Sequence, residues 1–74
     1  MVARLRYAGK VITVAGADGR ILGRLIPGGY IKGSPDSENF DVWTAKHPMV
    51  PTPSDTLLAE DLTMADAVAF LLDN

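Results

Sequence analysis

The sequence predicts an α+β fold: a small antiparallel sheet of three to five strands, with one C-terminal helix packed on its apolar face. Three observations lead to this prediction. Two aliphatic, β-branched runs flank the turn dipeptide Asp18-Gly19, further short strand-like runs are separated by proline- and glycine-rich segments, and helical apolar periodicity begins near Thr63. Strands that are followed by a helix, rather than alternating with helices, are typical of the α+β class.

The first strand is expected at residues 2–7, where small or apolar residues alternate with Arg4 and Arg6. Continuing this alternation would place both arginines on the aliphatic face of the next strand, so the alternation must be reset. Either a β-bulge or a tight turn at Ala8-Gly9 achieves the reset. We favour the bulge, because alanine is a poor residue at a position with positive φ.

Residues 11–26 are expected to form a β-hairpin around a two-residue type I′ turn centred on Asp18-Gly19. This turn places Ile12 opposite Leu25, and paired residues share a face of the sheet. A slip of one residue would mix the faces, so the pattern selects the register. One face then carries Ile12, Val14, Ile21 and Leu25, and the other carries Thr13, Arg20 and Arg24, with Val11, Leu22 and Ile26 among them.

The middle of the chain is predicted to contain one further clear strand. Residues 27–29, Pro-Gly-Gly, should end the hairpin's second strand, since proline cannot donate to a central ladder. Residues 30–32 are expected to be a short extended piece, and residues 33–39 a polar loop. Residues 40–45 alternate like a strand, and Trp43 is expected to anchor the core.

Residues 46–55 contain three prolines, which exclude both a helix and a central strand. We expect this segment to cross the surface in an extended, partly polyproline II form. Its Pro48-Met-Val-Pro51 stretch matches a PxxP docking pattern, but a stiff crossover is the favoured interpretation. Residues 56–60 are expected to form a last short strand.

The C-terminal helix is expected to begin at Thr63, whose hydroxyl can accept a hydrogen bond from the amide three residues later. Asp66 occupies the capping-box position at which Glu or Gln is usual. Phe70 falls to one side of the apolar stripe, so we expect either a loop, the proline segment, to cover it or a partner to contact it. The predicted stripe consists of Met64, Val68, Leu71 and Leu72.

Composition indicates a single domain over residues 1–74 with a modest core, because chains of this size bury only about 60–65% of their unfolded surface. The chain has no cysteine, so neither disulfides nor thiolate metal sites can stabilise the small core, and self-association is the remaining source of stability. We therefore expect a homodimer. No charged-then-apolar leader is seen, and the longest apolar run is far short of the ~20 residues that cross a bilayer. A cytoplasmic location without membrane contact is expected.

Charge is distributed unevenly along the chain, although the net charge is only −2. Residues 1–37 carry a net charge of +4, and residues 38–74 carry −6. Such asymmetry indicates an electrostatic partner, either another molecule or the other half of the same chain. The predicted binding residues are four arginines on one sheet face with a threonine between them, together with the aromatic residue of the helix: Arg4, Arg6, Thr13, Arg20, Arg24 and Phe70.

No catalytic, metal or cofactor motif is found. His47 is the only histidine, and its neighbours Lys46 and Pro48 are neither a nucleophile nor a carboxylate, so we expect a solvated loop residue. Residues 28–34 contain glycines, lysine and serine but lack the spacing and the following helix of a phosphate-binding loop. We expect a protein that is not an enzyme and has no cofactor.

Residues 57–72, Leu-Leu-Ala-Glu-Asp-Leu-Thr-Met-Ala-Asp-Ala-Val-Ala-Phe-Leu-Leu, with Trp43-Thr-Ala45 upstream, resemble the ending of small accessory proteins of bacteriophages and their actinobacterial hosts. The strands-plus-helix layout also resembles arm-type DNA-binding domains of phage integrases, which implies a sheet face inserted into a DNA groove. Such domains are usually basic, whereas this chain is acidic. The expected function is that of a phage-type accessory or host-interaction factor acting through protein contacts, with nucleic-acid binding by the arginine face as the alternative.

Overall fold

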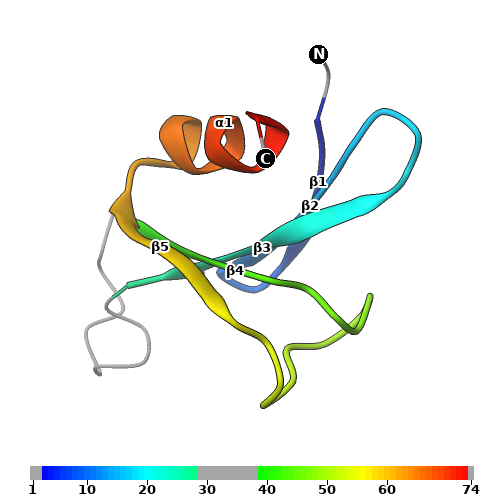
Figure 1. Ribbon diagram of the computed structural model, residues 1–74, viewed down its shortest axis with the longest axis horizontal. Helices are drawn as coiled ribbons and strands as arrows, with labels where there is room; N and C mark the ends of the chain where they lie inside the picture. The colour runs from blue at the N-terminus through cyan, green and yellow to red at the C-terminus, as the bar shows by residue number, and fades with distance from the viewer. Residues whose placement is uncertain (1–2, 29–38, 74) are drawn as a thin grey trace.

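The computed structural model describes residues 3–28 and 39–73, within which five antiparallel strands form one sheet with a helix over one face (Figure 1). The elements are β1 (Arg4–Ala8), β2 (Val11–Ala15), β3 (Ile21–Pro27), β4 (Phe40–Trp43), β5 (Leu57–Leu62) and α1 (Met64–Asp73). The strands lie in the sheet in chain order, from β1 to β5. The predicted α+β class is confirmed. The extended piece expected at residues 30–32, and the loop after it as far as residue 38, lie outside the described residues.

A tight turn joins β1 to β2, in place of the bulge that we favoured. Ala8 pairs with Val11, so Gly9 and Lys10 are the two central residues of the turn, and Gly9 has a φ of +62°. Glycine at the first central position is typical of the type II′ hairpin turn. The bulge prediction was wrong because the positive φ falls on Gly9 and not on Ala8. The predicted faces are retained, since the arginines of β1 share the face of Thr13.

The register of β2 and β3 is the predicted one from Ile12 to Val14, with Ile12 opposite Leu25. The turn that connects the strands differs from the prediction. The Gly19 amide donates to the Gly16 carbonyl oxygen at 3.0 Å, and of the described turn residues 16–20 only Gly19 has a positive φ, of +84°. A four-residue turn that ends in a left-handed glycine is thus formed, and the Asp18 carboxylate accepts a hydrogen bond from the Arg20 amide.

This turn changes the faces of two residues of β3. The register shifts next to Val14, so that Ile21 pairs with Ala15 and one extra residue stands on the β3 side. As a result Leu22 packs against the core, whereas Ile21 lines a groove on the arginine side of the sheet. The sequence pattern had assigned these two residues to the opposite faces, because strict alternation does not include a bulge.

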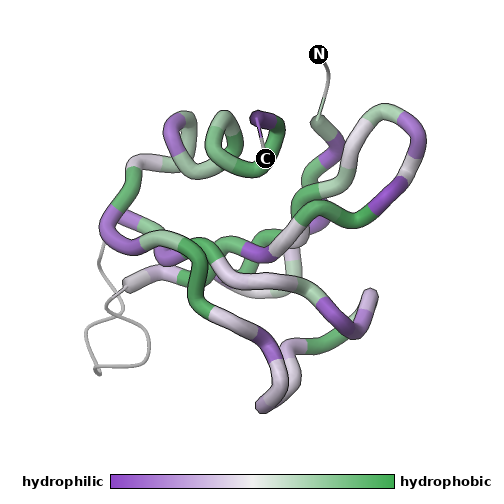
Figure 2. The backbone as a smooth tube through the Cα atoms, viewed as in Figure 1, coloured by the Kyte–Doolittle hydropathy of each residue, from purple (hydrophilic) through white to green (hydrophobic). Residues whose placement is uncertain are grey.

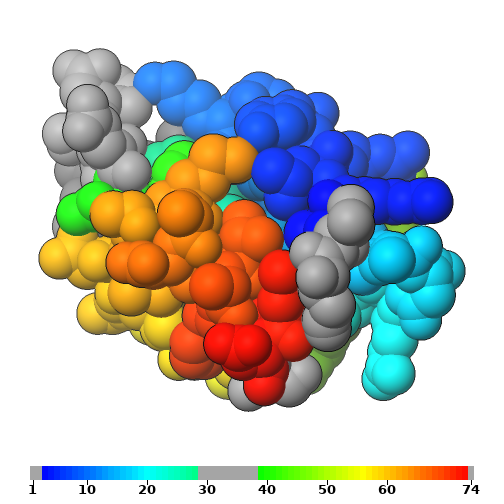
Figure 3. Space-filling view, turned by 90° about the horizontal axis from the view of Figure 1, so that it is seen from above, coloured from blue at the N-terminus to red at the C-terminus, as the bar shows by residue number. Residues whose placement is uncertain are grey.

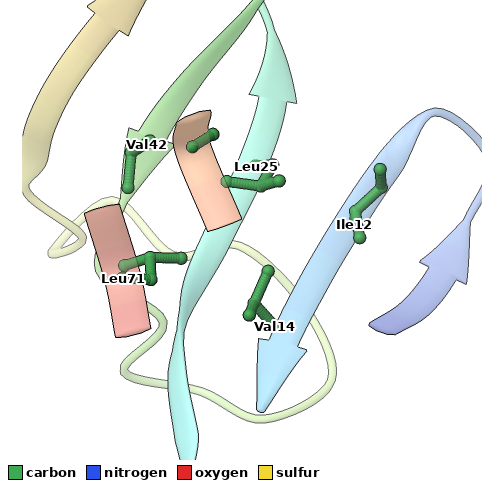
Figure 4. Close-up of a cluster of buried hydrophobic side chains, with 6 residues drawn as sticks. Ile12, Val14, Leu25, Val42 and Leu71 are labelled. Carbon is green, nitrogen blue, oxygen red and sulfur yellow. The ribbon is translucent and has the colours of Figure 1, made fainter. Parts of the chain in front are cut away.

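The core lies between the sheet and α1, which contacts β3, β4 and β5 (Figures 1 and 4). Gly23 makes this close packing possible. A Cβ atom at Gly23 would lie 2.7 Å from Cδ2 of Leu71 and 2.8 Å from the carbonyl oxygen of Trp43. A glycine inside a strand often marks such a close approach. The buried apolar residues are Ile12, Val14, Leu25, Val42, Ala67 and Leu71.

The helix begins as predicted. The hydroxyl oxygen of Thr63 accepts a hydrogen bond from the Asp66 amide at 3.2 Å. Figure 2 shows that apolar residues occupy most of the helix, and Figure 3 shows the helix lying across one face of the molecule beside β1. The helix residues that face the core are Met64, Ala67, Val68, Phe70 and Leu71.

Two predictions about this helix were wrong. Leu72 is half-buried outside the core cluster, and Phe70 takes its place in the packing. Phe70 is covered by the core itself and not by the proline segment, which lies on the other side of the sheet (Figure 1). The apolar residues surround most of this short helix, so that the apolar stripe alone did not decide which of them face the sheet.

Strand β5 extends two residues further than predicted, as far as Leu62. Its pairing with β4 shifts register twice, and Asp61 has a φ of +60°. The Asp61 amide donates to the Asp41 carboxylate at 3.2 Å, and the Asn39 side-chain amide donates to the Asp61 carboxylate at 2.8 Å. These bonds hold Asp61 in the left-handed region, which few residues other than glycine adopt.

Candidate binding surface

The sheet face opposite α1 carries a row of paired residues that crosses four strands. Arg6 pairs with Thr13, Thr13 with Arg24, and Arg24 with Trp43. Since paired residues share a face, all four side chains lie on the side away from the helix. Trp43 therefore does not anchor the core as predicted, and belongs to this second face.

Residues 44–56, which connect β4 to β5, lie against this second face (Figure 1). Asp55 organises the segment. Its carboxylate accepts hydrogen bonds from the amides of Lys46 and Thr52, both at 3.0 Å, and forms an ion pair with Arg24. The segment that was expected to be a stiff crossover is therefore folded against this face of the sheet.

Arg24 is the buried centre of this face, with only 1% of its surface exposed. Its Nε donates to the Thr13 hydroxyl at 3.3 Å, one terminal nitrogen lies 3.4 Å from the Asp55 carboxylate, and the other donates to the His47 carbonyl oxygen at 2.8 Å. A buried charge requires such partners. Because each of its nitrogens has a partner in the protein, Arg24 holds residues 44–56 on the sheet and is not offered to a ligand.

The pKa of Asp55 reflects this environment. Burial of the carboxyl raises its pKa, but the amide hydrogen bonds from Lys46 and Thr52, the Thr52 side chain and the charge of Arg24 lower it by more. The net result is a pKa below the ordinary value of an aspartate. Asp55 is therefore a carboxylate at neutral pH, which is the form that Arg24 requires.

The tip of the same segment is folded around His47. Its Nδ1 accepts hydrogen bonds from the amides of Met49 and Val50, at 3.1 and 3.3 Å. The sulfur of Met49 lies 3.2 Å from a guanidinium nitrogen of Arg6. The exposed loop histidine expected from the sequence is confirmed, and its ring shapes the loop.

An open groove of about 340 Å³ lies on the arginine side of β1 and β2, between the turn at residues 16–20 and Pro48. Both arginines of β1 line it, and both are exposed. The groove therefore combines positive charge with apolar surface and a hydroxyl. The groove is lined by Arg4, Leu5, Arg6, Thr13, Ala15, Gly19, Ile21 and Pro48.

A smaller cavity of about 140 Å³ lies under residues 51–55, next to the ring of Trp43. Ile26, Pro51, Thr52 and Asp55 complete its lining. The indole Nε1 of Trp43 is buried and has no hydrogen-bond partner among the described residues.

The predicted binding residues are therefore divided among four places. Arg4, Arg6 and Thr13 line the groove, and Arg24 is buried beside it. Arg20 is exposed in the turn but does not line the groove. Phe70 lies on the other side of the sheet, against the core, and so does not share a site with the arginines.

Asp55, Pro48 and Met49 were not among the predicted binding residues. A buried arginine requires a charged partner, and the acidic half of the chain is where that partner had to come from, but the alternation of the strand does not show that Arg24 is buried. Among the described residues, no group of His, Cys, Asp and Glu could hold a metal ion, and no helix is long and apolar enough to cross a membrane.

Comparisons with protein-family models, with curated protein sequences and with solved structures found no match to this chain.

Proposed function

We propose that this chain is a non-enzymatic binding protein that receives an acidic segment of a partner protein in the groove beside Arg4 and Arg6. The observation that carries the proposal is the combination, in one groove, of two exposed arginines with the apolar residues Ile21, Ala15 and Pro48. Guanidinium groups suit bidentate contacts with carboxylates. Apolar residues beside them can supply the anchoring contacts on which protein interfaces depend.

The loop next to the groove supports the same proposal. Met49 and Val50 are 61% and 53% exposed, and the sulfur of Met49 contacts Arg6. Large exposed apolar side chains beside a charged groove can be buried by a partner, and their contacts then exclude water from the ionic pairs.

Nucleic acid is the weaker alternative for this surface. Burial of Arg24 leaves Arg4, Arg6 and Arg20 as the exposed arginines of the described residues. Three phosphate contacts would give only weak binding at physiological salt. The net charge of −2 opposes binding to phosphate further.

The phage-type accessory role is part of this proposal and rests on the sequence resemblance of residues 57–72. The homodimer also stays a prediction, based on the small core of this short chain. Light scattering at micromolar concentration tests it, and a clean monomer would contradict it.

The binding proposal is tested by affinity capture from the source cell with three matched baits: the natural chain, Arg4→Glu with Arg6→Glu, and Arg20→Glu. The first variant changes the groove, and the second makes the same kind of charge change at an exposed arginine outside it. A protein partner should be lost with the groove variant and retained with Arg20→Glu, after nuclease treatment of all samples. Equal capture by all three baits, or capture that disappears with nuclease, would contradict the proposal.

A further inference from the structure

We infer that the acidic segment binds as an added strand along the outer edge of β1; this inference rests on the function proposed above. β1 is an outer strand, and within the described residues only β2 pairs with it. Four of its five residues are exposed, and the helix packs over β3, β4 and β5. Extended peptides often bind by adding a strand to such an edge.

The register identifies the backbone groups that an added strand would meet. In a hairpin closed by a two-residue turn, the closing pair, here Ala8 and Val11, exchanges hydrogen bonds, and every second pair does the same. Arg4, Arg6 and Ala8 thus direct their backbone groups towards β2. The N–H and C=O groups of Leu5 and Tyr7 point outward, where a ligand strand can pair with them.

The side chains of β1 define the chemistry of the ligand. Arg4 and Arg6 share the face of Thr13, whereas Leu5 and Tyr7 pair with the core residues Val14 and Ile12 and lie on the helix side. Leu5 also borders the groove, and Tyr7 is 61% exposed. Directly paired side chains of neighbouring strands are about 4.5–5.5 Å apart at Cβ. A strand that alternates carboxylates with apolar residues would therefore set its acids against the two arginines and its apolar residues against Leu5 and Tyr7.

A second copy of this chain fits the edge less well. Pairing β1 with β1 of another copy would bring arginines against arginines, which is unfavourable. The acidic outer strand β5 shifts register twice and contains Asp61 in a left-handed conformation, so that it offers no regular edge. An acidic segment of another protein meets neither obstacle.

The probe is a synthetic ten-residue peptide that alternates Glu and Val, titrated into the whole chain at about 0.15 M salt. The first control peptide replaces Glu with Lys. The second control peptide has the same sequence but is N-methylated at the residues whose backbone N–H groups would point towards β1. This removes the hydrogen-bond donors to the strand and keeps the charge of the peptide. We expect the unmodified Glu–Val peptide to bind and neither control peptide to bind. An N-methylated peptide that binds as tightly as the unmodified one would overturn strand addition.

Two variants separate the inference from the function on which it rests. Tyr7→Pro removes an outward donor, which an edge strand tolerates, whereas Tyr7→Ala removes the side chain and keeps the donor. We expect at least tenfold weaker binding for Tyr7→Pro than for Tyr7→Ala. If Arg4→Glu with Arg6→Glu abolishes binding but Tyr7→Pro does not, the groove function stands and strand addition is wrong. If the arginine variant has no effect, the proposed function itself is wrong.

Amide hydrogen exchange followed by NMR gives a readout that does not depend on a variant folding. The amides of Leu5 and Tyr7 should exchange rapidly in the free protein and become protected when the peptide binds. Unchanged exchange at both amides in the saturated complex would contradict the inference. Protection of both amides in the free protein, together with a dimer that Tyr7→Pro converts to a monomer, would show that a second copy occupies the edge instead.

Discussion

Arg24 on β3 and Asp55 in the segment between β4 and β5 form a buried ion pair, with Nη1 and Oδ2 3.4 Å apart and the two side chains 1% and 5% exposed. The pair joins two parts of the chain that are 31 residues apart. It holds residues 44–56 on the face opposite the helix, and these residues in turn provide Pro48 and Met49 beside the groove.

Removing Asp55 should destabilise the protein strongly, because it leaves a buried guanidinium without its counter-charge. We expect Asp55→Ala to lower the free energy of unfolding by about 3–5 kcal/mol. Urea denaturation followed by Trp43 fluorescence measures this loss. The double variant with Arg24→Met should lose less than the sum of the single variants. A loss under about 1 kcal/mol for Asp55→Ala, as for a surface pair, would contradict the buried role.

Stability should depend on pH through the same carboxyl group. The pKa of Asp55 is lower in the folded protein than in the unfolded chain, so its contribution is present above about pH 4, the ordinary aspartate value, and is lost as the pH falls through the folded pKa. The difference in unfolding free energy between the natural chain and Asp55→Asn should therefore be large at pH 7 and become smaller in acid. A difference that stays constant from pH 7 to pH 3 would argue against this linkage.

Gly23→Ala should be destabilising although it occurs in a strand. The new methyl group would lie 2.7 Å from Leu71 and 2.8 Å from the Trp43 carbonyl oxygen, and the latter cannot move without its strand. We expect a loss of about 1–3 kcal/mol by thermal or urea denaturation. Gly28→Ala is the matched control, since its nearest neighbour is the Asp41 side chain at 3.3 Å. Equal effects of the two substitutions would show that the close approach of α1 is not limiting.

Phe70→Ala should cost about 1–3 kcal/mol, which is less than the loss for a fully buried phenylalanine, because the ring is only half-buried against the core. Leu72→Ala should cost clearly less, as Leu72 lies outside the core cluster. Thermal denaturation of both variants shows which substitution lowers the stability more. If Phe70→Ala leaves the stability unchanged, the ring is free for a partner instead.

Binding to mixed-sequence duplex DNA should not be measurable at ~0.15 M salt. Arg4, Arg6 and Arg20 supply at most three phosphate contacts, which corresponds to a log–log salt slope of about −2.7. A mobility-shift experiment at low micromolar protein tests this expectation. A shift that Arg4→Glu with Arg6→Glu abolishes would instead make nucleic acid the ligand of the groove.

Local pattern was enough to predict much of the fold. Alternation with a period of two assigned the faces of β1 and β2, and the requirement that these faces agree selected the pairing of Ile12 with Leu25. The hydroxyl of Thr63 marked the start of the helix. Each of these features depends on residues that are close in sequence or on neighbouring strands, so that the sequence itself carries the information.

The tertiary structure alone decided what the arginine face became. Arg24 follows the same alternation as Arg4 and Arg6, and nothing in that pattern distinguishes a solvated arginine from one buried under residues 44–56. Its burial depends on Asp55, Thr13 and the His47 carbonyl group meeting at one point from distant parts of the chain. A periodic pattern shows which way a side chain points from its strand, whereas long-range packing determines what lies above it.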